Sequence, residues 1–242
     1  MEDRQSLLIS DHINITEKIK LRIPKVGDIL EDEQSYFSIV STLTSTPYQC
    51  MVQLDDVGID YTQITNYELF TTLFPMCGKG DLSLFFYDMN TSDYGVCVDQ
   101  SNNTIILFSP TNGVDYKIDE FIYIKIVNAL RKINNMEEVK SKPGNDEAKR
   151  YLLEKERKKQ KRNAKKLYKP YLENLIIALV NRPEFKYNYE EVMDLSIYKF
   201  NQSLKQIHTS ITFDKTMMGV YSGTIDVSKI TDKSCLSWID NS

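Results

Sequence analysis

"LSLFFYDMNTSDYGVCVDQSNNTIILFSP", residues 82–110, decides the fold class of this 242-residue chain. The segments 82–89, 94–100 and 104–110 are short and rich in aromatic and branched side chains, which favour extended backbone. The turn-forming clusters "NTSD" and "SNN" separate them. We therefore expect three antiparallel strands arranged as a meander.

The segment that follows has a helical period. "YKIDEFIYIKIVNALRKIN", residues 116–134, places Ile118, Ile122, Ile126 and Leu130 four residues apart, with Lys and Arg near its end. Basic side chains interact favourably with the C-terminal end of the helix dipole. We expect a helix that covers the small sheet.

Upstream, the pattern predicts one strand and two helices. "KIKLRI", residues 18–23, alternates polar and apolar side chains and ends at a proline, which is typical of a strand. A turn at Gly27 and an acidic segment then precede apolar residues at helical spacing between 36 and 43. Thr65 and Glu68 form a capping-box pattern that predicts a helix directing Leu69, Phe70, Leu73 and Phe74 toward a core.

Pro143, Gly144 and Asn145 interrupt the pattern and mark a domain boundary. We predict an α+β domain over residues 1–140, a charged linker or basic helix over 141–169, and a helical domain over 170–242. The fold class is therefore α+β: a small antiparallel meander with covering helices, then a mainly helical C-terminal half. Within that half, Leu236, Trp238 and Ile239 near the end of the chain predict a docked terminus, and two glycines, 219 and 223, predict turns.

The basic stretch "KERKKQKRNAKK", residues 155–166, is the strongest charge feature. It contains eight of the 30 basic residues and one of the 34 acidic residues. The remainder of the chain therefore has 22 basic and 33 acidic residues, a net charge of −11. No hydrophobic residue occurs between Glu154 and Asn163, so this part cannot pack into a core.

The stretch has three uses on sequence grounds: a solvated or bridging helix, a contact to an acidic patch on a partner protein or on another copy, and a sequence-blind nucleic-acid arm. Its candidate partner-binding residues are Lys158, Lys159, Lys161 and Arg162.

The sequence contains no recognisable catalytic or cofactor motif. His12 and His208 have no cysteine or acid at metal-ligand spacing, and the four cysteines are too scattered for a metal site or a disulfide scaffold. We expect reduced, mostly buried thiols, no metal, no cofactor and no enzymatic activity. "LDDVGID", residues 54–60, departs from the EF-hand pattern and indicates a polar loop around Gly58.

Neither a signal peptide nor a membrane span is expected, because the N-terminus is acidic and the longest apolar run is "LIIALV", residues 175–180. A secreted or membrane-bound location is therefore not predicted.

Three segments carry a family resemblance: "GIDYTQITNYELFTTLF", "NRPEFKYNYEEVMDLSIYKFNQSLKQI" and "MMGVYSGTIDVSKI". They resemble uncharacterised proteins from the structural gene clusters of tailed bacteriophages and prophages of Gram-positive bacteria. The pattern around "VMDLSIYKF" is also similar to phage tail assembly chaperones and baseplate-hub assembly proteins.

The resemblance implies a phage morphogenesis protein, either a tail or baseplate component or its assembly chaperone, located in the virion or the host cytoplasm. Its partners would be other phage structural proteins or further copies of itself, with no membrane involved. The surfaces implied are the helix around Tyr198 and the predicted turn that contains Met217, Met218 and Tyr221. The alternative from another class is a nucleic-acid-associated accessory protein anchored by residues 155–166.

Overall fold

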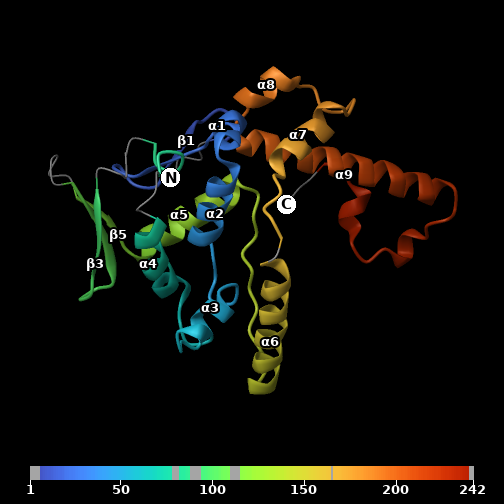
Figure 1. Cartoon of the computed structure of the whole chain (residues 1–242). Helices are drawn as coiled ribbons and strands as arrows, with labels where there is room; N and C mark the ends of the chain where they lie inside the picture. Colours follow the sequence, from blue (N-terminus) through green and yellow to red (C-terminus); the bar gives the residue numbers. More distant parts are fainter. Residues whose placement is uncertain (1–5, 78–81, 88–93, 110–114, 165, 240–242) are drawn as a thin grey trace.

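A computed structural model describes residues 6–77, 82–87, 94–109, 115–164 and 166–239. It confirms the α+β class: two small antiparallel sheets belong to the N-terminal half, and the C-terminal half is helical (Figure 1). The first sheet pairs β1 (His12–Asn14) with β2 (Lys20–Arg22), and the second has the order β3 (Gly95–Asp99), β4 (Thr104–Phe108) and β5 (Asp115–Ile118).

The three-stranded meander exists, but one of its predicted strands is wrong. Residues 82–87 form a turn that is joined to β2 by an isolated bridge between Phe86 and Leu21 rather than by a strand ladder, and residues 88 and 89 lie outside the described residues. The third strand is β5, where Ile118 pairs with Ile105 of β4. We had placed this segment at the start of a helix.

The reason for the error lies in the spacing of three large side chains. Leu82, Phe85 and Phe86 are all at least 98% buried, and Phe85 stacks on Tyr36 with ring centroids 5.2 Å apart. An alternating strand would turn half of its side chains away from the core. A compact turn places all three in it.

The predicted periodicity located the helices that begin at Glu33, Asn66 and Glu120 but not those that begin at Val26 and Met51, and these five are the described helices of the N-terminal half. They are α1 (Val26–Glu31), α2 (Glu33–Leu43), α3 (Met51–Asp56), α4 (Asn66–Cys77) and α5 (Glu120–Ile133). The capping box is confirmed, because Glu68 N–H donates to Thr65 Oγ1 at 3.1 Å and Thr65 N–H donates to Glu68 Oε2 at 2.7 Å. Gly27 is not a turn but lies inside α1, where a Cβ would come within 3.1 Å of Met193 O.

The C-terminal helices are α6 (Asp146–Asn163), α7 (Leu172–Val180), α8 (Tyr189–Asp194) and α9 (Ile197–Tyr221). Two short 3-10 helices, η2 (Val227–Lys229) and η3 (Lys233–Leu236), follow. The predicted turn at Gly219 is wrong, since Gly219 lies inside α9; the turn comes at Gly223, whose φ is +73°. The terminus does dock: η3 packs on α9, and Gln206 donates from Nε2 to Trp238 O at 2.6 Å.

One hydrophobic core includes residues from both halves of the chain. Leu21, Val40, Phe74 and Ile126 share it with the C-terminal residues Leu172, Ile176, Val192, Ile197 and Phe200. Backbone hydrogen bonds join the halves directly: Val26 N–H donates to Leu195 O, and Ile197 N–H donates to Pro24 O, each at 2.8 Å. The domain boundaries near residues 140 and 170 stay predictions.

Glu33 is a second link between the halves. Its carboxylate is 93% buried and accepts hydrogen bonds from Tyr168 Oη and Tyr171 N at 2.7 Å and from Leu172 N at 3.1 Å. Burial alone would raise the pKa of Glu33, but these three donors outweigh it and lower the pKa below its ordinary value. Glu33 thereby fixes the start of α7 against the first residue of α2.

The four cysteines are free, as expected, but the prediction that they are mostly buried is wrong. Cys97 is exposed and the other three are half-buried. Cys97 lies on β3, which is at one end of the strand order in the described three-stranded sheet.

Candidate protein-interaction site

The predicted site residues fall on two separate parts of the molecule. The basic residues belong to α6, whereas Tyr198, Met217, Met218 and Tyr221 belong to α9. Figure 1 shows α6 and the far end of α9 pointing away from the body in different directions. The structure therefore does not bring the two sets together.

The inner side of α6 is attached to the body by charge. Arg157 binds Asp55 through Nη2 at 2.5 Å and Asp56 through Nη1 at 2.7 Å, and Lys149 binds Asp60 at 2.5 Å. The Lys149 ammonium, with the N–H and hydroxyl of Thr62, lowers the pKa of Asp60 to about 2. Asp55 and Asp56 are the last two residues of α3, and Asp60 lies in the loop that follows Gly58, whose φ is +76°. The polar loop predicted over residues 54–60 therefore begins only after Asp56.

A small apolar contact completes this attachment. Leu152 and Leu153 are half-buried against a second hydrophobic cluster formed by Met51, Val52, Leu54, Tyr61 and Leu69. No residue of α6 is itself buried, as the absence of an apolar stripe predicted. Sequence reasoning missed the attachment because the acids and the cations that pair are about 90 to 100 residues apart.

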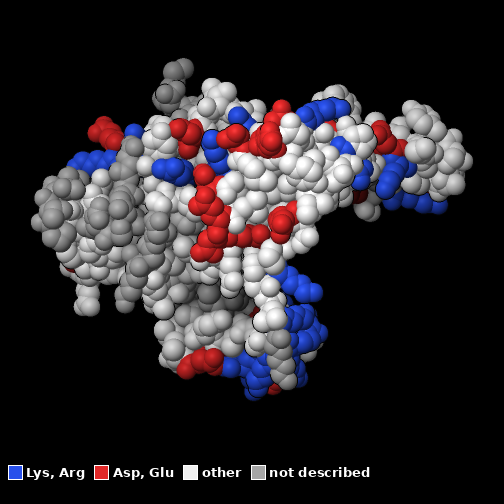
Figure 2. Space-filling model, turned by 45° about the horizontal axis from the view of Figure 1, so that its top comes forward, with Lys and Arg blue, Asp and Glu red and all other residues white. Residues whose placement is uncertain are grey.

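The predicted partner-binding residues of α6 are four basic residues near its C-terminal end. Lys158, Lys159, Lys161 and Arg162 are exposed. Lys158 lies 3.8 Å from Glu154 and Lys159 lies 3.2 Å from Glu156, and within the described part of the chain Lys161 and Arg162 have no carboxylate within ion-pair distance. Figure 2 shows Lys and Arg gathered at this end of the molecule.

The predicted residues of α9 divide into a buried start and an exposed end. Tyr198 is half-buried against the main core. Met217, Met218 and Tyr221 lie together near the C-terminal end of the helix and, with Phe213 and Asp214, line a shallow hollow of about 500 Å³. Met218 is 70% exposed and Tyr221 is 83% exposed.

The surface at the end of α9 is larger than the sequence indicated. Beyond Ile207, none of the described residues up to 239 is buried, although this stretch contains many apolar side chains. After the helix, the chain turns and runs back beside α9 (Figure 1). It adds four exposed apolar residues that we had not proposed: Ile225, Val227, Trp238 and Ile239. We call residues 208–239 the α9 tip.

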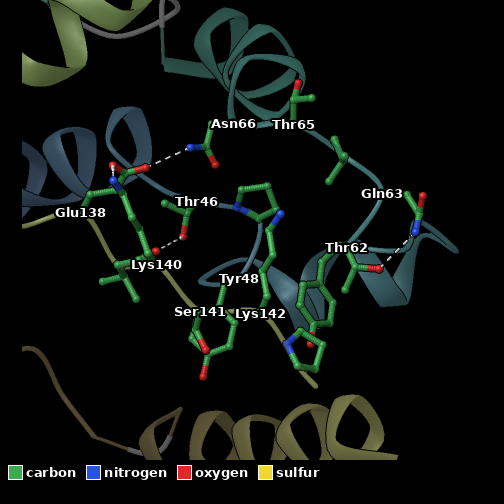
Figure 3. A pocket seen from close by; sticks show the side chains of 15 residues that line it. Thr46, Tyr48, Thr62, Gln63, Thr65, Asn66, Glu138, Lys140, Ser141 and Lys142 are labelled. Carbon is green, nitrogen blue, oxygen red and sulfur yellow. Dashed lines mark hydrogen bonds and ion pairs between the residues drawn. The ribbon is translucent and has the colours of Figure 1, made fainter. Parts of the chain in front are cut away.

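A cleft of about 590 Å³ lies between three segments, Thr46–Tyr48, Tyr61–Asn66 and Glu138–Pro143. Figure 3 shows how Glu138 is held: Asn66 donates to one carboxylate oxygen at 3.2 Å, and Lys140 binds the other at 3.1 Å. The described lining contains no histidine or cysteine. Glu138 is thus engaged as a structural link between the segments.

The described residues offer neither a metal site nor a membrane-spanning helix. They contain no group of three or more His, Cys, Asp or Glu side chains that could hold a metal ion. None of their helices is both long and apolar enough to cross a lipid bilayer. The two histidines lie apart: His208 is exposed on α9, while the His12 ring is hydrogen-bonded to Asp11 and packs on Tyr87.

Comparison with known proteins gives one family match. Residues 158–242 match the family described as YomV second domain, a phage/prophage-type protein family. No curated protein and no solved structure matches the chain. The match supports the resemblance at the level of phage association. It begins within α6 and includes the whole α9 tip.

Proposed function

We propose that this chain is a non-enzymatic phage morphogenesis protein, either a tail or baseplate component or its assembly chaperone. It acts through protein surfaces, and the α9 tip is the surface that contacts a phage structural protein.

The observation that carries the proposal is the exposed apolar character of the α9 tip. Burial of large apolar side chains drives most protein association, and exposed apolar groups that gather on one element mark interaction sites. Met218, Tyr221 and Trp238 are each more than half exposed. Aromatic residues and methionine are enriched at protein interfaces. The phage-type family match includes this same region.

Deletion of the coding sequence from the phage or prophage genome that carries it tests the role. We expect electron micrographs of the induced lysate to show heads with absent or incomplete tails. Supply of the wild-type chain from a plasmid should restore complete particles, whereas Met218→Lys combined with Tyr221→Lys should not. Normal tailed particles in the deletion strain would overturn the proposal.

Met76 provides a matched control for Met218. Both methionines are 70% exposed, and both lie in the last turn of a helix, α4 and α9 respectively. Met76→Lys should therefore restore tails as well as the wild type does. Equal failure of both variants would show that the α9 tip has no special role.

A further inference from the structure

The two sides of α6 differ in where their ion-pair partners lie: the inner cations pair with carboxylates of the body, whereas the ion pairs of the outer cations are made within the helix itself. Lys149, Leu152, Leu153 and Arg157 recur at helical spacing on the side attached to the body. Lys155, Lys158, Lys159 and Arg162 occupy i, i+3, i+4 and i+7, which places them on the opposite side. All four are exposed. We call these four residues the outer row.

The attachment fixes the direction in which the outer row faces. Because Arg157 and Lys149 hold the inner side to the carboxylates of Asp55, Asp56 and Asp60, the outer row faces solvent as a set. It spans about 10 Å along the helix axis. Within the described residues, its only carboxylate neighbours are Glu154, 3.8 Å from Lys158, and Glu156, 3.2 Å from Lys159.

The composition of this side favours a phosphate backbone over an acidic protein. Protein interfaces are anchored by apolar and aromatic residues and are depleted in lysine. Residues 154–163 contain no hydrophobic side chain, and three of the four outer-row residues are lysines. A nucleic-acid backbone requires only cations, since phosphate contacts fix position without reading sequence.

The charge of the remaining chain limits where a polyanion can bind. Residues outside 155–166 include 22 basic and 33 acidic residues, which repel phosphates over most of the surface. We propose that the outer row of α6 is a sequence-independent binding site for the phosphate backbone of nucleic acid. This site is separate from the α9 tip and does not rest on the function proposed for it.

Fluorescence anisotropy with a labelled 20-base-pair duplex of mixed sequence tests the site in the full chain. If the outer row makes four phosphate contacts, the logarithm of the binding constant should fall with the logarithm of salt concentration with a slope of about −3.6. That slope corresponds to a loss of affinity on the order of 100-fold between about 50 and 200 mM salt. Absence of binding at 50 mM salt would overturn the proposal.

Substitution of the outer row by glutamine should remove most of this slope and weaken binding at low salt at least tenfold. The variant should retain the circular dichroism spectrum and melting temperature of the wild type, because none of the four side chains reaches the core. Unchanged DNA binding by a folded variant would contradict the proposal.

The charge-matched control replaces four exposed lysines outside α6, namely Lys18, Lys117, Lys132 and Lys186. It should bind the duplex with the wild-type slope. A loss of DNA affinity equal to that of the outer-row variant would show that only net charge matters.

Poly-glutamate is the probe that imitates an acidic protein. Binding to poly-glutamate without binding to DNA would assign the surface to an acidic protein and overturn the proposal. Met218→Lys with Tyr221→Lys should leave DNA binding unchanged, which separates a failure here from a failure at the α9 tip.

Discussion

Glu33 shows how much a single residue contributes to joining the halves of this chain. Its buried carboxylate accepts three hydrogen bonds from residues about 135 to 139 positions away. No sequence pattern indicated this, because a glutamate in the first turn of a helix is ordinarily explained by the helix dipole alone. Its partner Tyr168 has a pKa raised to about 12 by its own burial and by the Glu33 carboxylate.

Replacement of Glu33 by alanine should destabilise the protein by about 1 to 3 kcal/mol, because it leaves three hydrogen-bond donors, including the buried N–H of Leu172, without their acceptor. Urea denaturation measures the change. Glu31→Ala, two residues away and exposed, is the control and should be nearly neutral. A Glu33→Ala variant as stable as the control would show that water replaces the carboxylate.

The same residue predicts a pH dependence. The pKa of Glu33 is lowered from its ordinary value of 4.5, so the unfolded state takes up a proton at higher pH than the folded state does. Its contribution is therefore complete above about pH 4.5 and is lost as pH falls through the folded pKa. The difference in free energy of unfolding between the wild type and Glu33→Gln should therefore become smaller as pH falls through this acidic range. A constant difference between pH 7 and pH 3 would contradict the assignment.

Helix α6 shows at the scale of an element that charge, rather than apolar periodicity, can orient a helix. Its inner cations pair with carboxylates at the end of α3 and in the loop after Gly58, and its outer cations face solvent. An isolated helix with so little apolar surface gains little from packing, so its position depends on these pairs and on Leu152 and Leu153.

Replacement of Lys149 and Arg157 by glutamine, the inner double variant, should loosen α6 from the body. Replacement of Lys158, Lys159, Lys161 and Arg162 by glutamine, here called the outer variant, should not. Hydrogen exchange with mass spectrometry should show several-fold faster exchange in α6 of the inner double variant. The outer variant should keep the wild-type exchange rate and melting temperature, because solvated charges contribute little to folding. A fall in its melting temperature of about 10 °C or more would show that the outer side is packed after all.

The end of α9 makes a second prediction at this scale. A Cβ on Gly219 would lie 2.4 Å from Ile225 Cδ1, so Gly219→Ala should push the returning chain away from the helix. Trp238 is the only tryptophan of the sequence, and its carbonyl accepts a hydrogen bond from Gln206 of α9, so release of the returning chain should increase acrylamide quenching of its fluorescence. Gly144→Ala is the control, because no atom lies within 4 Å of its added Cβ. Equal quenching in both variants would show that Ile225 adjusts without releasing the tail.

At the scale of the whole molecule, the family-matched region is not separated from the rest by its core. Leu172, Ile176, Val192 and Phe200 belong to the same cluster as N-terminal residues such as Leu21 and Phe74. A fragment of residues 158–242 would expose these side chains to water, so it should lack a cooperative thermal transition. Differential scanning calorimetry of the fragment beside the full chain measures this. A sharp transition in the fragment would show that it folds independently.

The sequence by itself determined the fold class and most of the helices, because these depend on contacts between residues close in the chain. Apolar residues at helical spacing located α2 and α5, and the Thr65 and Glu68 side chains fixed the start of α4. Its composition also singled out α6 by charge, whereas Met217, Met218 and Tyr221 at the end of α9 were expected in a turn rather than in a helix.

Only the tertiary structure decided which segments become neighbours. The aromatic segment 82–87 is a turn because its large side chains share one core, and Asp115–Ile118 is a strand because β4 offers it an edge. Likewise, α6 forms ion pairs with Asp55, Asp56 and Asp60, and the start of α7 is hydrogen-bonded to Glu33. These contacts join residues roughly 90 to 140 positions apart, and a local pattern carries no information about such pairs since they form only when the common core brings them together.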